Sequence, residues 1–315
     1  MFLIFYILIV VALFVFEMLY FRVADKFNII DKPNERSSHT RITLRGGGVV
    51  FYFGVFLFTV LQGWLYPAFF LGLSLISTVS FLDDIRPLSS RFRLPLHFVA
   101  IGIMFIDLDL YSLLPWYCWP IALVIAVGII NAFNFMDGIN GITGAYSIVA
   151  LVSLWYVNQY IVAFADQTLI YIVFLSVLVF NFFNFRTKAS CFAGDVGSVS
   201  IAFILVFLLG KLIVVSGDLR YLLFLGVYGI DTILTIVHRI ILKENILKAH
   251  RKHAYQLMAN ELKIPHLIVS LCYSGLQLIL SILTILVPFY SLLFVVLLVI
   301  IYIVFKLKYF SLHKF

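Results

Sequence analysis

Charged residues are scarce in this sequence of 315 amino acids, because only 12% of them are Asp, Glu, Lys or Arg. A soluble domain usually carries about 25% charged residues. The shortage excludes a soluble enzyme and favours a chain embedded in lipid, in agreement with its 63% of hydrophobic residues. One membrane-spanning helix needs roughly 20 apolar residues, so the length allows about ten or eleven spans. We therefore interpret residues 1–315 as one polytopic membrane domain with no separate soluble part.

Cysteine is also rare, and the sequence contains only Cys118, Cys191 and Cys272. They lie far apart without paired spacing, so neither a disulfide framework nor a zinc ribbon is expected. The N-terminus lacks a basic segment and a small-residue cleavage site, and we interpret its apolar run as a retained first helix. The net charge is +7, but no basic stripe on a soluble module accompanies it, so we expect no nucleic-acid partner.

Long apolar runs indicate the fold class. We predict eleven transmembrane helices, at 2–21, 46–62, 64–82, 94–107, 116–133, 142–157, 168–185, 198–215, 221–237, 267–287 and 290–306. The tight turns near Gly63 and Pro288 are the weakest boundaries, and ten spans are the alternative. The sequence therefore predicts an all-α polytopic membrane protein, and eleven spans place its two termini on opposite sides of the bilayer.

Positive charge is confined to alternate connections between the predicted spans. Of the 22 Lys and Arg residues, 20 fall in the segments 22–45, 83–93, 186–197, 238–264 and 306–315. A sixth segment on the same side, 131–141, has none but is rich in Asn, Asp and Gly. Connections that carry Lys and Arg face the cytoplasm in most membrane proteins. We therefore place the N-terminus outside and the C-terminus in the cytoplasm.

Two of these cytoplasmic connections carry carboxylates. Asp83 and Asp84 follow the third predicted span, and adjacent carboxylates repel one another unless a cation lies beside them. The pair suits a divalent ion or a base acting on a phosphate, and a solvated loop is the alternative. Asn131, Asn134 and Asp137 are spaced by three residues, so they project from one face if the helix persists. Their oxygen atoms suit Mg²⁺, and a polar helix end with a glycine stop is the alternative.

Two further connections carry groups that suit anions. The turn Gly194-Asp195-Val196-Gly197-Ser198 precedes the eighth predicted span. Free N–H groups at a helix start attract an anion, and Asp195 offers a carboxylate to a metal, with a plain N-cap as the alternative. The longest connection contains His250 and His253. No H-E-x-x-H glutamate accompanies them, and the basic residues around them favour phosphate. A positive-inside loop explains the Lys and Arg but not the histidines.

All four groups of residues lie on the same predicted side. Carboxylates and Asn for Mg²⁺, with Arg, Lys and His for phosphates, are the groups that phosphoryl transfer needs. Their position at a lipid boundary indicates that one substrate is a lipid. A membrane transporter of an anionic solute is the alternative from another class. It is less favoured, because the two halves show no repeat and only Glu17, Lys211 and Asp231 are charges deep in the spans.

The motifs, taken in order, resemble those of the polyprenyl-phosphate N-acetylhexosamine-1-phosphate transferases. They are Asp31 to Asn34 with Arg36 to His39 and Arg45 to Gly48, the pair Asp83-Asp84, the segment Asn131 to Gly141, the segment Phe192 to Ser198, and His250 to Gln256. The resemblance covers about residues 28–262. Asn140 stands where this family usually has Asp, so the charge of that position is missing here.

The resemblance implies that a sugar 1-phosphate passes from a UDP-sugar to undecaprenyl phosphate. The products would be a lipid-linked pyrophosphoryl sugar and UMP, at the start of cell-surface glycan synthesis. The resemblance also implies Mg²⁺, with Mn²⁺ as an alternative ion, and a UDP-N-acetylhexosamine or its 6-deoxy derivative. It places the enzyme in a bacterial inner membrane with the active site facing the cytoplasm, and it leaves a homodimer open.

The same resemblance assigns roles by position. Asp195 would hold the metal, with Asn134 near it. Asp83 would deprotonate or align the attacking lipid phosphate, with Asp84 beside it, and Asp137 is a third catalytic candidate. The candidates for substrate binding are Phe192, by stacking on the uracil, His250, Arg251 and His253, at the pyrophosphate or the sugar, and Arg45 and Asn131.

Overall fold

The computed structural model describes residues 2–33, 41–245 and 250–312, and within them it is helical apart from one small sheet. Its elements are α1 (Phe2–Lys26), β1 (Ile30–Asp31), β2 (Thr43–Leu44), α2 (Val49–Leu61), α3 (Pro67–Ile85), α4 (Ser90–Asp107), α5 (Leu110–Leu113), η1 (Trp116–Cys118), α6 (Trp119–Met136), α7 (Ile142–Tyr160), α8 (Gln167–Asn184), α9 (Gly194–Ser216), η2 (Leu219–Leu225), α10 (Gly226–Ile241), α11 (Ala254–Gln256), η3 (Leu257–Glu261), α12 (His266–Leu286) and α13 (Pro288–Leu312). The all-α class is confirmed. Residues 34–39 of the first motif lie outside the described residues.

Each of the eleven predicted ranges overlaps a long helix of the structure. Within the described ranges, eight helices are long and apolar enough to cross a membrane, and α2 is a shorter apolar helix. The turns near Gly63 and Pro288, the two weakest boundaries in the sequence, are both breaks between helices. Pro288 begins α13, where a missing N–H group costs no hydrogen bond, and Gly63 has a φ of +61° between α2 and α3, which favours glycine.

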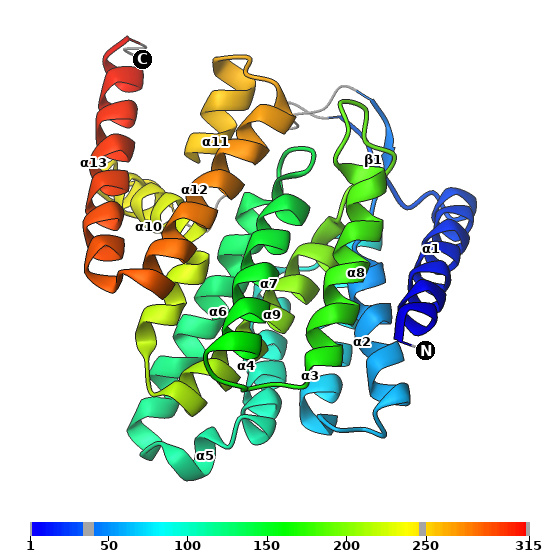
Figure 1. Cartoon of the computed structure of the whole chain (residues 1–315). Coiled ribbons are helices and arrows are strands. Elements are labelled where there is room, and N and C mark those ends of the chain that lie inside the picture. Colours follow the sequence, from blue (N-terminus) through cyan, green and yellow to red (C-terminus); the bar gives the residue numbers. More distant parts are fainter. Residues whose placement is uncertain (1, 34–40, 246–249, 313–315) are drawn as a thin grey trace.

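The helices form a bundle around α9. This helix is apolar around its whole circumference and most of its residues are buried, as expected for a core helix. The outer helices α1 and α13 instead expose many large apolar side chains. β1, α11 and the end of α13 lie at one end of the bundle, and α5 lies at the other (Figure 1). The described residues of three basic segments, those around β1, around α11 and at the end of α13, thus share one end, as the sequence predicts.

A small sheet, which the sequence did not predict, attaches the first connection to the start of α9. Ile30 pairs with Leu44 in the antiparallel pair β1–β2, and Leu44 also forms a parallel bridge with Cys191. Two glycines then allow α2 and α9 to cross closely, because a Cβ atom on Gly48 would lie 2.2 Å from the Cα atom of Gly197. Residues 45–48 are therefore fixed beside the first turn of α9.

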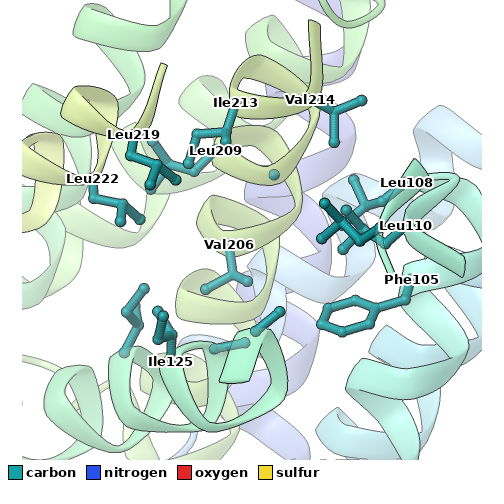
Figure 2. Close-up of a pocket in the computed structure, with 15 residues that line it drawn as sticks. Phe105, Leu108, Leu110, Ile125, Val206, Leu209, Ile213, Val214, Leu219 and Leu222 are labelled. Atoms are coloured by element: carbon teal, nitrogen blue, oxygen red, sulfur yellow. The ribbon is translucent and has the colours of Figure 1, made fainter. Parts of the chain in front are cut away.

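The other end of the bundle contains a cavity of about 170 Å³ between α4, α5, α6, α9 and η2. Its walls are apolar side chains, including Leu108, Ile125, Val206 and Leu222 (Figure 2). No charged side chain of the described residues lines it. The groups that could carry phosphoryl chemistry lie at the opposite end, where α9 begins.

Candidate active site

Two carboxylates and a guanidinium meet where α3 ends and α9 begins. Asp83 lies in the last turn of α3 and Asp195 in the first turn of α9. Nη1 of Arg93, near the start of α4, donates to Oδ2 of Asp195 at 2.6 Å and also to Oδ2 of Asp83. The exposed fractions of the side chains are 9% for Asp83, 17% for Asp195 and 28% for Arg93. We call these three residues the acid cluster, and a ligand can reach it from solvent.

Asp84 has different surroundings from its neighbour Asp83. Its side chain is fully buried, and its two oxygens accept hydrogen bonds from the backbone N–H groups of Asp195, at 2.8 Å, and Val196, at 2.9 Å. These N–H groups belong to the first turn of α9 and have no acceptor within the helix. A Cβ atom on Gly194 would lie 2.6 Å from Oδ2 of Asp84, so glycine permits this approach. Asp84 thus holds the start of α9, and with it Asp195, in place.

Arg45, in the connection between α1 and α2, forms ion pairs with Asp84 of α3 and Asp195 of α9. Its Nε atom lies 2.7 Å from Oδ1 of Asp84, and its Nη2 atom donates to Oδ1 of Asp195 at 3.1 Å. Its backbone is also fixed, because its carbonyl oxygen accepts from the hydroxyl of Tyr20 at 2.6 Å. Burial lowers the pKa of Arg45, but the carboxylates of Asp84 and Asp195 outweigh this and raise it above its usual value. The guanidinium therefore stays charged beside the acid cluster.

The two asparagines of α6 differ in position. Nδ2 of Asn134 donates to the hydroxyl of Ser198 at 3.1 Å, and that hydroxyl donates to the carbonyl of Gly194 at 3.1 Å. Asn134 is thus attached to the first turn of α9, close to Asp195, as the metal prediction requires. Asn131 lies one turn earlier, and its Nδ2 atom donates to the carbonyl of Val127 within α6 at 3.0 Å.

Asp137 lies beyond the helix that was expected to present it. α6 ends at Met136, and Asp137 adopts φ −84° and ψ 59°, so the helical spacing with Asn131 and Asn134 stops one residue short. Its Oδ1 atom accepts from the hydroxyl of Thr143 at 2.6 Å. Burial raises the pKa of Asp137 to about 7. This carboxyl therefore sits against the start of α7.

The surroundings of Asn140 account for an Asn at a position where the resembled family usually has Asp. Its side-chain amide donates to the carbonyl oxygens of Arg186, at 2.8 Å, and Thr187, at 3.3 Å. Its own carbonyl accepts from the hydroxyl of Ser270 at 2.9 Å. A carboxylate at this position would face two carbonyl oxygens with no proton to donate. Asn140 thus connects its own loop to the loop at Arg186 and to α12, and a negative charge does not suit its surroundings.

Phe192 is fixed through its backbone just before α9. Its N–H group donates to the carbonyl of Leu44 at 2.8 Å, and its own carbonyl accepts from the N–H group of Gly47 at 2.9 Å. The side chain is half-buried. Its position, three residues from Asp195, is compatible with the predicted contact to a base.

The histidine loop, residues 250–256, is anchored by a carboxylate of α10. Both oxygens of Asp231 lie 3.1 Å from the N–H group of Ala254, at the start of α11. Nδ1 of His253 lies 3.2 Å from Oδ1 of Asp231, and the hydroxyl of Tyr273 donates to Oδ2 at 2.6 Å. The His250 ring lies 5.0 Å from the His253 ring, and burial lowers the pKa of His250 to about 4. The His250 imidazole is therefore neutral at pH 7, while the half-buried Arg251 supplies charge to the loop.

Tyr255 connects the histidine loop to the segment 131–141. Its side chain is buried, and its hydroxyl donates to the carbonyl of Phe135 at 2.8 Å. Gly138 gives it room, since a Cβ atom there would lie 2.2 Å from the Tyr255 hydroxyl oxygen. The rings of Phe135 and His253 are 6.1 Å apart. The structure thus brings together the connections that carry all four groups of predicted residues.

The acid cluster suits a magnesium ion that is shared with a substrate. Across the described parts of the chain, no three His, Cys, Asp or Glu side chains are arranged to hold a metal. Mg²⁺ commonly binds through one or two carboxylates and takes its other ligands from water and substrate phosphates. Asp83 and Asp195 contact the same nitrogen of Arg93, and Asn134 lies nearby. Two carboxylates with an amide oxygen fit such an ion.

Sequence reasoning missed three residues of this site. Arg93 was counted only as a basic loop residue, and Asp231 only as a charge deep in a span. The sequence did contain a signal for Asp231, because a carboxylate within an apolar helix is costly and needs polar partners. Tyr255 was noted only within its motif. All three act through contacts with residues far away in the chain, which local spacing does not display.

Comparisons with known proteins match this chain to one group of enzymes. The family model "Glycosyl transferase family 4" matches residues 66–213, a range that contains the acid cluster. A probable undecaprenyl-phosphate N-acetylglucosaminyl 1-phosphate transferase of Bacillus subtilis is 28% identical over 260 residues, which cover 76% of this chain and 72% of the relative. An undecaprenyl-phosphate alpha-N-acetylglucosaminyl 1-phosphate transferase of Thermotoga maritima is 28% identical over 257 residues, 76% of each protein. The enzyme of that name from Escherichia coli (strain K12) is 29% identical over 224 residues, which cover 63% of this chain and 60% of the relative.

Proposed function

We propose that the chain belongs to the polyprenyl-phosphate N-acetylhexosamine-1-phosphate transferase family and that it transfers a sugar 1-phosphate from a UDP-sugar to undecaprenyl phosphate. An oxygen of the lipid phosphate attacks the β-phosphorus of the UDP-sugar. A new P–O bond forms, the bond between the β-phosphorus and the bridging oxygen breaks, and UMP leaves. The product is a lipid-linked pyrophosphoryl sugar that starts a cell-surface glycan.

The observation that carries the proposal is the joining of Asp83 and Asp195 through one nitrogen of Arg93. Phosphoryl transfer needs few covalent steps from the protein, and its catalysis depends on positioning and on stabilising negative charge. Two carboxylates that can share a cation, next to the guanidinium groups of Arg93 and Arg45, meet that need. A transporter finds no support, since the relatives named above are all transferases.

We propose the following roles for the residues of the site. Asp195 and Asp83, with Asn134, would hold Mg²⁺, or Mn²⁺ in its place, and the bound ion would neutralise charge on the diphosphate. Asp83 would also align the attacking phosphate. Asp84 acts through α9 and is a positioning residue. The remaining candidates are Asp137 for catalysis, and Phe192, Asn131, His250, Arg251 and His253 on the nucleotide-sugar side.

We further propose that the sugar is an N-acetylhexosamine, with N-acetylglucosamine or a 6-deoxy derivative as the first candidates. The names of the relatives and the histidine loop support this choice. The basic segments at one end of the bundle support a cytoplasmic active site in a bacterial inner membrane, where UDP-sugars are available.

The experiment uses membranes from cells that produce the protein. They receive undecaprenyl phosphate, Mg²⁺ and one radiolabelled UDP-sugar at a time, and the label in the lipid phase is counted. We expect lipid-linked product from at least one UDP-N-acetylhexosamine, loss of product with EDTA, and its return when Mg²⁺ is restored. No lipid product from any UDP-sugar, with membranes lacking the protein as the reference, would contradict the proposal.

A further inference from the structure

His97 is a buried polar residue that belongs to none of the motifs. It lies inside α4, and 5% of its surface is exposed. Neither of its ring nitrogens has a hydrogen-bond partner among the described residues, and neither does Nε of Arg93. Buried polar atoms in native proteins almost always have a partner. Three such atoms on one helix therefore indicate that these side chains meet a ligand.

The position of His97 relates it to the acid cluster. It follows Arg93 by four residues, so the two side chains share one face of α4. Side chains on a helix lean toward its N-terminus, and the His97 ring therefore leans toward Arg93. The Cα atom of His97 thus lies about one helical turn, roughly 6 Å, further along α4 than that of Arg93, whose guanidinium bridges Asp83 and Asp195.

Other faces of α4 expose apolar side chains. Leu94 and Val99 are 43% and 51% exposed, as apolar residues on a lipid-facing surface would be. His97 is therefore reached by going from the acid cluster toward the apolar part of the bundle. In the proposed reaction the phosphate of the lipid acceptor would come from the bilayer, whereas the nucleotide sugar would come from water.

The chemistry of the two side chains selects an anion. A ring N–H of His97 and the Nε–H of Arg93 are both donors, and phosphate oxygens are strong acceptors for charged donors. We propose that His97, together with Nε of Arg93, binds an oxygen of the lipid acceptor's phosphate and holds it beside Asp83. This inference rests on the proposed function, because the lipid phosphate is the acceptor of that reaction.

The test compares His97→Leu, His97→Gln and the parent in steady-state kinetics. Loss of a hydrogen bond to a charged group typically lowers affinity by about 10- to 100-fold. We expect His97→Leu to raise KM for undecaprenyl phosphate by about that factor and to leave KM for the UDP-sugar within about twofold. His97→Gln keeps a donor and should recover most of the loss. Val99→Ala, on the lipid-facing side of α4, is the matched control and should behave as the parent.

A binding measurement separates the two sources of phosphate without turnover. The thermal midpoint of each purified variant is recorded with undecaprenyl phosphate alone and with UDP-N-acetylglucosamine alone. The inference predicts that His97→Leu loses the lipid-induced shift and keeps the nucleotide-induced shift. The reverse pattern would assign the phosphate to the nucleotide sugar and overturn the inference, and so would unchanged shifts with unchanged KM values. A lipid-induced shift that depends on His97 in a parent that makes no lipid product would overturn the proposed function but not the binding site.

Discussion

The acid cluster and the histidine loop are each held by a buried carboxylate that caps a helix from outside. Asp84 accepts the N–H groups of Asp195 and Val196 at the start of α9. Asp231 accepts the N–H group of Ala254 at the start of α11. Both use the N-terminal end of a helix, where free N–H groups favour a negative charge. The same device thus fixes two loops that are far apart in the sequence.

The two anchors differ in their other partners. Asp84 pairs with the guanidinium of Arg45, whereas Asp231 accepts from hydroxyl groups, such as that of Tyr273, and contacts the ring of His253. The helices differ too, because α9 has 23 residues, most of them buried, and α11 has three. A charge network on a core helix suits a site that must keep a rigid geometry. A short helix held by one carboxylate suits a loop that recognises one substrate.

The largest expected effect is the loss of activity in Asp195→Asn. The amide would keep the size of the side chain but remove the charge that Arg45, Arg93 and the proposed Mg²⁺ need. We expect transferase activity to fall by about 10³-fold or more, measured as kcat/KM in membranes. Asp166→Asn is the matched control, because Asp166 caps α8, away from the acid cluster. An Asp195→Asn variant with more than a tenth of the parent activity would mean that the cluster is not the catalytic centre.

Asp84→Asn tests the rigid anchor. Its amide nitrogen would face a backbone N–H group, and Arg45 would lose its buried partner. Breaking a buried charge pair typically costs about 3–5 kcal/mol, so we expect a lower thermal midpoint in detergent and lower activity toward both substrates. Asp83→Asn should lose activity while keeping the midpoint of the parent. If the two variants lost stability equally, the distinction between positioning and chemistry within this pair would be wrong.

Asp231→Asn tests the loop anchor. We expect kcat/KM for the UDP-sugar to fall by about 10²-fold, because the amide removes the negative charge and one of the two acceptor oxygens that hold His253 and α11. KM for undecaprenyl phosphate should stay close to that of the parent. Equal effects on the two substrates would show that the histidine loop is not confined to the nucleotide-sugar side, and the comparison of the two anchors would then fail.

Tyr255→Phe should have the smallest effect. It removes one hydrogen bond, from the hydroxyl to the carbonyl of Phe135, which typically contributes about 1 kcal/mol. We expect kcat/KM for the UDP-sugar to decrease about fivefold, because 1.4 kcal/mol corresponds to a factor of ten. An effect as large as that of Asp231→Asn would indicate that Tyr255, not Asp231, is the main anchor.

The sequence predicts the helices of this fold well, because the apolar length of each span is a local property. All eleven ranges overlap a helix. It also predicts which connections meet, since alternate connections lie at one end of a bundle. It did not predict that α6 stops at Met136, one residue before Asp137, nor that β2 bridges to Cys191. Those features depend on packing against distant segments.

The roles of individual charges were harder to predict for the same reason. Asp83 and Asp84 are neighbours in the sequence, but only the structure shows that Asp84 turns toward the start of α9. Arg45 reaches a carboxylate 150 residues away. The role of each charged side chain depends on how deeply it is buried and on which groups surround it. Both depend on the packing of the whole bundle.

The most direct test of the transferase proposal follows two labels at once. UDP-N-acetylglucosamine, or the UDP-sugar that the membrane assay selects, is labelled in the sugar and in the β-phosphate and given to the protein with undecaprenyl phosphate and Mg²⁺. We predict that both labels enter the lipid in a one-to-one ratio while unlabelled UMP is released. Transfer of the sugar label without the β-phosphate label would contradict sugar-1-phosphate transfer at the acid cluster.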